Sequence, residues 1–175
     1  MGTQPTSGLS DLSQVLWHER EALELLLFKL EEQRLLLGDG QARWVCHATR
    51  EVDAALDQVG SMELNRAVSA AAAAAELGVR EDVGLRQLAA AAPPPWPSVI
   101  ERHLGALVRL AEEIIGLAAS NRALLDHGLA QVRKTMDRGT RRPSTRMLVD
   151  AAALHAAIAS NDRVLQPSLV DAVKG

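Results

Sequence analysis

Histidine, cysteine and carboxylate side chains could carry metal or acid–base chemistry, but their spacing in this sequence completes no such site. His18 and Glu19 begin like a helical zinc-protease motif, which needs a second histidine four residues after the first, where Ala22 stands. Cys46 and His47 are neighbours on a predicted helix, so they point about 100° apart around its axis. Because the chain has no second cysteine to complete a zinc site, we expect no bound metal.

Other reactive patterns are also missing from the sequence. None of the five histidines follows a glutamate by three residues, as a di-iron helical bundle would require. The chain has no Gly-Lys dipeptide for a phosphate-binding loop and no Gly-x-Ser-x-Gly turn for a serine hydrolase. His103 and Asn121 lie on an apolar stripe, where polar groups that fix the register of a bundle are more common than catalytic groups. We therefore predict a protein that is not an enzyme and binds no cofactor.

A repeat of leucines near the start of the chain predicts a long helix that packs against other helices. Leucine recurs every seventh residue, at Leu9, Leu16, Leu23, Leu30 and Leu37. The intermediate positions of this three-four spacing are Leu12, Glu19, Leu26 and Gln33. Two polar residues therefore interrupt an otherwise apolar seam.

The rest of the chain is typical of an all-α protein. It contains 29 alanines, one phenylalanine and no tyrosine, a composition that favours helices over sheets. Apolar spacing predicts long helices over residues 10–37, 41–77 and 97–136, a short helix over 85–89 and a proline-rich crossover before the third long helix. We expect an antiparallel bundle of three long helices, with Trp17, Trp44 and Trp96 packed where helices and the crossover meet.

The C-terminal part of the chain carries weaker signals. We expect a helical domain over residues 9–137 and a flexible tail over 138–175, in which residues 148–159 could form a short helix. Residues 133–146 contain six basic residues and one acidic residue, but no aromatic side chain that could stack on bases. A solvated connector is therefore favoured over a nucleic-acid site.

Composition also bears on the compartment. Cys46 is the single cysteine, so no internal disulfide can form, and the chain does not start with a secretory signal pattern. The sequence has no run of 18 apolar residues that could span a bilayer. We expect a cytoplasmic protein without stable membrane insertion.

The first predicted helix resembles the first helix of the FlgN family of flagellar type III export chaperones, as that family occurs in actinobacteria. The resemblance is strongest over residues 16–33, which contain the patterns Trp17-x-Glu19-Arg20 and Leu25-Leu26-x-Phe28-Lys29-Leu30. Weaker matches follow in the same order at Arg43-Trp44, Glu51-Val52, Glu63-Leu64, Pro95-Trp96, Glu113-Ile114, Asn121-Arg122 and Gly128-Leu129. Together they cover about residues 9 to 136.

This resemblance implies a chaperone that binds the terminal amphipathic helices of hook-filament junction (hook-associated) proteins and delivers them to the flagellar export gate. It implies no ATP and no metal. Its client-recognition region corresponds to the second half of the third long helix, where the leucine stripe is wider than one seam and a glycine permits close approach. The predicted client-binding residues are Leu117, Asn121, Leu124, Leu125, Gly128, Leu129, Val132 and Met136.

Two other functions remain open from the sequence. A structural coiled-coil scaffold or adaptor protein would use the leucine seam for self-association, and a homodimer is also open for the chaperone. A nucleic-acid binder would use the basic residues of 133–146, and its binding would weaken steeply with salt.

We predict that Cys46 and His47 are chemically silent. Replacing Cys46 by serine and His47 by alanine should leave the melting temperature and client binding unchanged, because neither side chain belongs to a complete site. Circular dichroism and a binding assay would measure this. Stoichiometric zinc in carefully purified protein would contradict the prediction.

Overall fold

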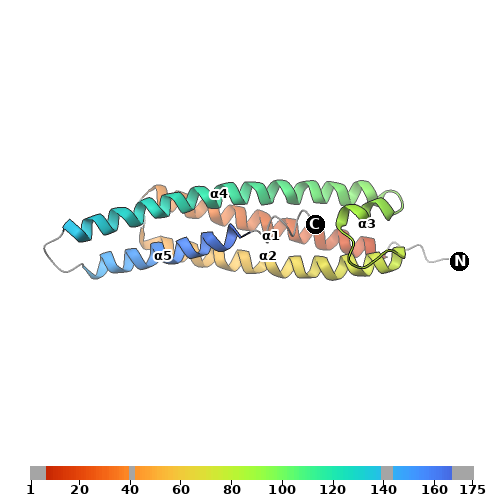
Figure 1. The fold of residues 1–175 in the computed structure, drawn as a ribbon, viewed down its shortest axis with the longest axis horizontal. Coiled ribbons are helices and arrows are strands. Elements are labelled where there is room, and N and C mark those ends of the chain that lie inside the picture. Colours follow the sequence, from red (N-terminus) through yellow and green to blue (C-terminus); the bar gives the residue numbers. More distant parts are fainter. Residues whose placement is uncertain (1–6, 40–41, 139–143, 167–175) are drawn as a thin grey trace. The chain divides into compact units, whose positions relative to one another are not determined.

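The computed structural model describes residues 7–39, 42–138 and 144–166, and over these residues the chain forms five helices and no strand. The all-α prediction is confirmed. The helices, labelled in Figure 1, are α1 (Ser7–Gly38), α2 (Ala42–Leu77), α3 (Leu85–Ala91), α4 (Trp96–Arg138) and α5 (Thr145–Val164).

The predicted helix ends lie within a few residues of the observed ones. Gly78 ends α2 with a φ of 68°, a left-handed conformation that glycine adopts without steric cost. The helix α1 ends at Gly38 and is followed by a turn at Asp39. Gln41, the predicted first residue of the second long helix, lies outside the described residues together with Gly40. The short helix α3 extends two residues beyond its predicted end.

The helix α5 differs most from the expectation. It spans 20 residues instead of the 148–159 expected within a flexible tail, and the Ser144 hydroxyl caps its start by accepting a hydrogen bond from the Met147 amide at 3.3 Å. Its buried residues are Ala153, Leu154, Ala157, Ser160, Asn161 and Val164. Most of these side chains are small, which is why composition did not indicate a packed helix. The boundary after residue 137 stays a prediction, and residues 139–143 and 167–175 of the expected tail lie outside the described part.

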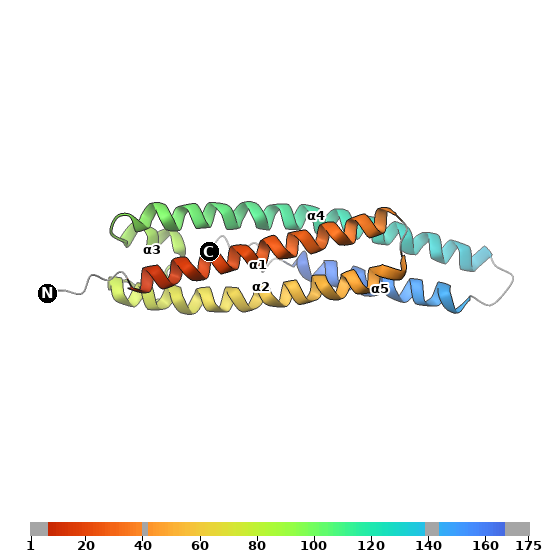
Figure 2. The ribbon, with the colours of Figure 1, turned by 180° about the vertical axis from the view of Figure 1, so that it is seen from behind.

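The described chain divides into two compact units. The first comprises residues 7–25 and 57–112, and the second comprises residues 26–56 and 113–166. In the first unit, the beginning of α1 and the end of α2 run antiparallel: the Gly8 amide donates to Glu76 Oε2 at 3.0 Å, and Arg66 Nη1 donates to Glu19 Oε1 at 2.7 Å. Figures 1 and 2 agree that the first part of α4 runs alongside this part of α1.

A buried ion pair lies inside the first unit. Glu19, one of the two polar residues in the leucine seam, is fully buried and is paired with the buried Arg66. Burial raises the pKa of Glu19 to about 7, against the opposing effect of the Arg66 guanidinium, and the nearby Glu63 carboxylate raises it further. Burial also raises the pKa of Glu63. A buried carboxylate with a raised pKa makes folding sensitive to pH near neutrality.

The tryptophans do not all pack as expected. Trp17 and Trp44 are about half exposed, and each lies beside an arginine guanidinium, Arg20 at 5.5 Å and Arg43 at 5.2 Å from the ring centres. Such surface cation–π contacts contribute about 0.5–1 kcal/mol. The packing prediction is therefore wrong for these two residues, whereas Trp96 is half-buried at the start of α4.

The raised pKa of Glu19 predicts that stability falls as pH rises. Below about pH 4.5 the carboxyl is protonated in both states, but between pH 4.5 and about 7 only the folded state keeps the proton. The free energy of unfolding should therefore fall by up to about 3 kcal/mol over this interval and level off above it. Urea unfolding at several pH values would measure the slope.

Glu19→Gln should flatten this dependence, because the amide does not titrate. Glu101→Gln, which changes an exposed residue of the same unit, provides the matched control and should keep the wild-type slope. An unchanged slope in Glu19→Gln would show that Glu19 is not the responsible group.

Candidate functional site

The eight residues predicted to bind a client lie on α4, and the structure does not leave them as one open surface. Four of them, Leu117, Asn121, Leu125 and Leu129, are buried. Leu124 is exposed, and Gly128, Val132 and Met136 are half-buried. Half of the predicted groove therefore belongs to the interior of the second unit.

The helix α5 covers this part of α4. Leu125 and Leu129 form one apolar cluster with Leu154 and Ala157 of α5 and with Val45 of α2. Val132 packs against the edge of the same cluster, together with the partly buried residues Leu37, Ala151 and Ile158. The stripe expected to receive a client helix thus receives a helix of the same chain.

Gly128 lies where α4 and α5 approach each other. A Cβ atom added at this glycine would lie 3.6 Å from Cδ1 of Leu154. Close approach to another helix was the expected role of this glycine, and in this structure its neighbour is α5.

A buried polar cluster joins α5 to the other helices of the second unit. Gln33, the second polar residue of the leucine seam, donates to Thr49 Oγ1 at 3.3 Å. Its Oε1 accepts hydrogen bonds from Asn161 Nδ2 at 2.8 Å and from Asn121 Nδ2 at 3.2 Å. Asn121 also donates to the Leu30 carbonyl at 2.8 Å. Since α1, α2, α4 and α5 all contribute, the cluster sets their register.

Ion pairs at the surface add to this arrangement. Arg122 of α4 donates from Nε to Asp162 Oδ1 at 2.8 Å, and Arg163 of α5 donates to Asp53 Oδ1 at 3.0 Å. Partly exposed pairs of this kind contribute about 0–1 kcal/mol each. They orient α5, but the apolar cluster and the buried amides account for most of its attachment.

An open groove lies elsewhere in the second unit, between the end of α1 and the start of α2. It encloses about 570 Å³, and its residues are Lys29, Glu32, Leu35, Leu36, Trp44, His47, Ala48 and Glu51. Leu35 is 70% exposed there. No residue of this groove was among the predicted site residues. The available signal was the pair Leu35 and Leu36, two large apolar residues that lie outside the leucine seam.

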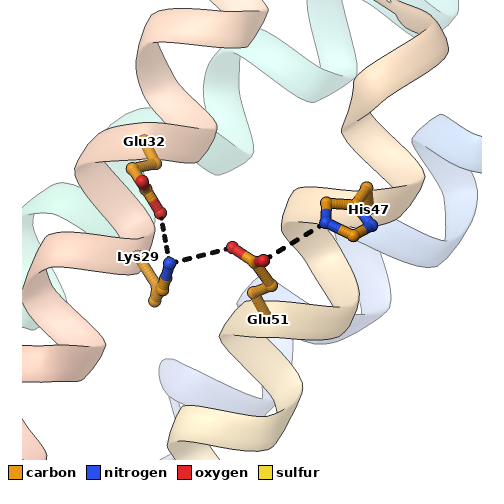
Figure 3. A network of polar contacts seen from close by, with 4 residues as sticks. All are labelled: Lys29, Glu32, His47 and Glu51. Atoms are coloured by element: carbon orange, nitrogen blue, oxygen red, sulfur yellow. Dashed lines mark hydrogen bonds and ion pairs between the residues drawn. The ribbon is translucent and has the colours of Figure 1, made fainter.

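Figure 3 shows the polar side chains that border this groove. Lys29 Nζ donates to Glu32 at 2.7 Å and to Glu51 at 2.9 Å, and His47 Nε2 lies 3.2 Å from the other oxygen of Glu51. Hydrogen bonds to Glu32 and Glu51 raise the pKa of Lys29, and the bond from Lys29 lowers the pKa of Glu51. A carboxylate held ionised in this way is a weak base, so the network is suited to positioning α1 against α2 rather than to proton transfer.

One serine and one histidine lie close together in the first unit. Ser13 Oγ is 3.2 Å from His103 Nε2, and burial lowers the pKa of His103, with Arg20 and Arg102 adding to the effect. A hydrolase would need a third group to orient the imidazole, and no carboxylate is bonded to His103 among the residues that the structure describes. The contact is a neutral hydrogen bond between α1 and α4.

The described ranges also bear on metal binding and on membrane insertion. No group of three or more histidine, cysteine or acidic side chains there could hold a metal ion. None of the helices that the structure describes is both long and apolar enough to cross a membrane.

The fold and these contacts define an all-α protein. Its main candidate site is the apolar face of α4 that α5 covers. Comparison with protein families gives the assignment: the model described as FlgN protein matches residues 1–148. The chain belongs to the FlgN family, a family of flagellar export chaperones and not of enzymes. No curated protein and no solved structure matches the chain.

The packing of α5 predicts different effects for two leucines of this helix. Leu154→Ala should lower the free energy of unfolding by about 2–3 kcal/mol, because Leu154 is buried in the apolar cluster. Leu148→Ala, the same change at an exposed position of α5, should cost less than about 0.5 kcal/mol. Urea unfolding measures both, and equal effects would mean that α5 is not packed in solution.

Proposed function

We propose that this protein is an export chaperone that binds the terminal amphipathic helices of hook-filament junction proteins in the cytoplasm and delivers them to the flagellar export gate. Membership of the FlgN family supports the chaperone class. Family membership alone does not give the client, the export gate or the binding face, and we propose these three.

The observation that carries the proposal is the packing of α5 against the apolar face of α4. Leu125 and Leu129 provide an apolar stripe, and Gly128 between them provides room for a close neighbour. A groove that receives an amphipathic helix needs these properties. We propose that a client helix takes the place of α5 on this face, with Leu124, Val132 and Met136 at its border.

The composition of α5 supports an exchange of helices. Leu154 and Val164 are its buried large aliphatic residues, whereas its other buried residues are Ala153, Ala157, Ser160 and Asn161. Each additional buried methylene stabilises a contact by about 0.8 kcal/mol. A client helix with leucine or isoleucine at the alanine positions would therefore bury more apolar surface than α5 and could displace it.

A second candidate is the structural coiled-coil scaffold that associates with itself. Leu64 and Val68 lie one turn apart on α2, and both are about two-thirds exposed. This apolar pair on a helix surface favours contact with a second chain. Light scattering of the purified protein distinguishes the two functions, since a scaffold would be a stable oligomer that does not bind junction proteins.

If a client helix replaces α5 on α4, substitutions in α5 and substitutions in α4 should have opposite effects on client affinity. Leu154→Ala should raise the affinity for a peptide of a junction protein's terminal helix, by at most about 150-fold, because it weakens the competing helix by about 2–3 kcal/mol. Leu125→Ser with Leu129→Ser should lower the affinity by roughly 30- to 1,000-fold, because these residues would contact the client. Titration calorimetry measures both.

Binding should be compared at a temperature where circular dichroism shows each variant to be folded. Leu148→Ala is the matched control and should bind the peptide like the wild type. If Leu154→Ala also weakened binding, α5 would be part of the client site rather than its competitor. If the double serine variant bound normally, the client would bind elsewhere.

A further inference from the structure

The end of α4 and the start of α5 carry a concentration of positive charge that the chaperone function does not use. The four basic residues described there are all exposed, and they are Arg133, Lys134, Arg138 and Arg146. The sequence from 133 to 146 carries five net positive charges, in a chain whose net charge is −3, so the remaining residues carry a net charge of −8. The asymmetry is large for a chain of this size.

None of these four cations forms an ion pair with an acidic side chain within the part of the chain that the structure describes. Arg133 Nη2 lies 3.3 Å from His155 Nε2 on α5. The acidic residues nearby are Asp137 and Asp150. The net charge of the region stays positive with both included.

Two aliphatic side chains are exposed next to the cations. Leu148 and Val149, in the first turns of α5, are 52% and 58% exposed. Val149 lies three residues after Arg146, so the two share one helix face. On α4, Lys134 and Arg138 are likewise one turn apart. Cationic and apolar side chains therefore occur together on the same end of this helix pair.

We propose that this basic tip, consisting of Arg133, Lys134, Arg138, Arg146, Leu148 and Val149, binds the surface of a bilayer that contains anionic lipids. Clusters of exposed lysine and arginine are attracted to anionic headgroups, and adjacent aliphatic side chains can enter the headgroup region. The negative charge of the remaining chain is repelled by the same surface, so the protein should contact it through these residues. The attachment is peripheral and reversible.

The composition of the basic tip favours lipid over nucleic acid. The sequence has no phenylalanine, tyrosine or tryptophan after Trp96, so bases would find no aromatic side chain to stack on. Leu148 and Val149 would also stay exposed to water on a nucleic acid, because its phosphate backbone is polar, whereas in a bilayer they can enter the apolar part of the headgroup region.

Flotation of the full chain with vesicles tests the proposal. The protein should float with phosphatidylcholine vesicles that contain about 30% phosphatidylglycerol in about 50 mM salt, and it should stay unbound with pure phosphatidylcholine or in about 500 mM salt. Lys134→Gln, Arg138→Gln and Arg146→Gln combined should lower the partition coefficient about 100-fold, since each cation contributes about a factor of five.

The matched control combines Arg86→Gln, Arg102→Gln and Arg109→Gln, which removes the same charge from exposed residues of the first unit. It should bind the vesicles like the wild type. Leu148→Ser with Val149→Ser should weaken vesicle binding while leaving any binding of polyphosphate or transfer RNA unchanged.

Three outcomes would overturn the proposal. The first is equal flotation with neutral and anionic vesicles, and the second is equal loss in both triple variants. The third is an unchanged partition of the aliphatic double variant together with equally tight binding of transfer RNA, which would indicate a general polyanion site. Client-peptide affinity, measured on the same variants, separates this proposal from the chaperone function.

Discussion

Two polar side chains buried in the leucine seam of α1 constrain the rest of the structure. A carboxylate or an amide removed from water must find partners, because an unpaired one costs about 1–3 kcal/mol or more. Glu19 finds Arg66 on α2, and Gln33 finds Thr49, Asn121 and Asn161 on three other helices. One polar residue lies in each unit. A helix shifted along α1 by one turn would lose these partners while keeping most of its leucine contacts, so the polar residues select the register that the leucines leave open.

The part of the fold governed by local physics could be predicted from the sequence. Heptad leucines indicated α1, and apolar spacing placed the end of the second long helix at residue 77, directly before Gly78, which has a positive φ in the structure. The helix α5 was underestimated, because its buried side chains are mainly alanine, serine and asparagine. Such residues give little hydrophobic signal, and their burial depends on Leu125, Leu129 and Gln33 being present on other helices. Tertiary partners of this kind cannot be read from a local pattern.

The candidate site was predictable as an apolar face but not as a covered one. The spacing of leucines on α4 indicated more apolar surface than one neighbouring helix could cover, and the structure buries Leu117, Leu125 and Leu129. Periodicity gives the width of such a stripe, but not whether the helix that covers it comes from the same chain. The tryptophans illustrate the reverse error. Bulk suggested packing for Trp17 and Trp44, whereas both rings lie at the surface beneath arginines.

The spacing at Gly128 has a consequence for the evolution of this interface. A Cβ atom there would meet Leu154 at 3.6 Å, an ordinary van der Waals distance, so alanine would fit beside α5 without displacing it. Alanine would also favour the helix by about 1 kcal/mol over glycine. Glycine at this position therefore makes α4 less stable than alanine would, and it leaves a methyl-sized space beside α5. Selection for a neighbour that packs more closely than α5 would preserve the glycine, and drift toward alanine would mark relatives that have lost such a neighbour.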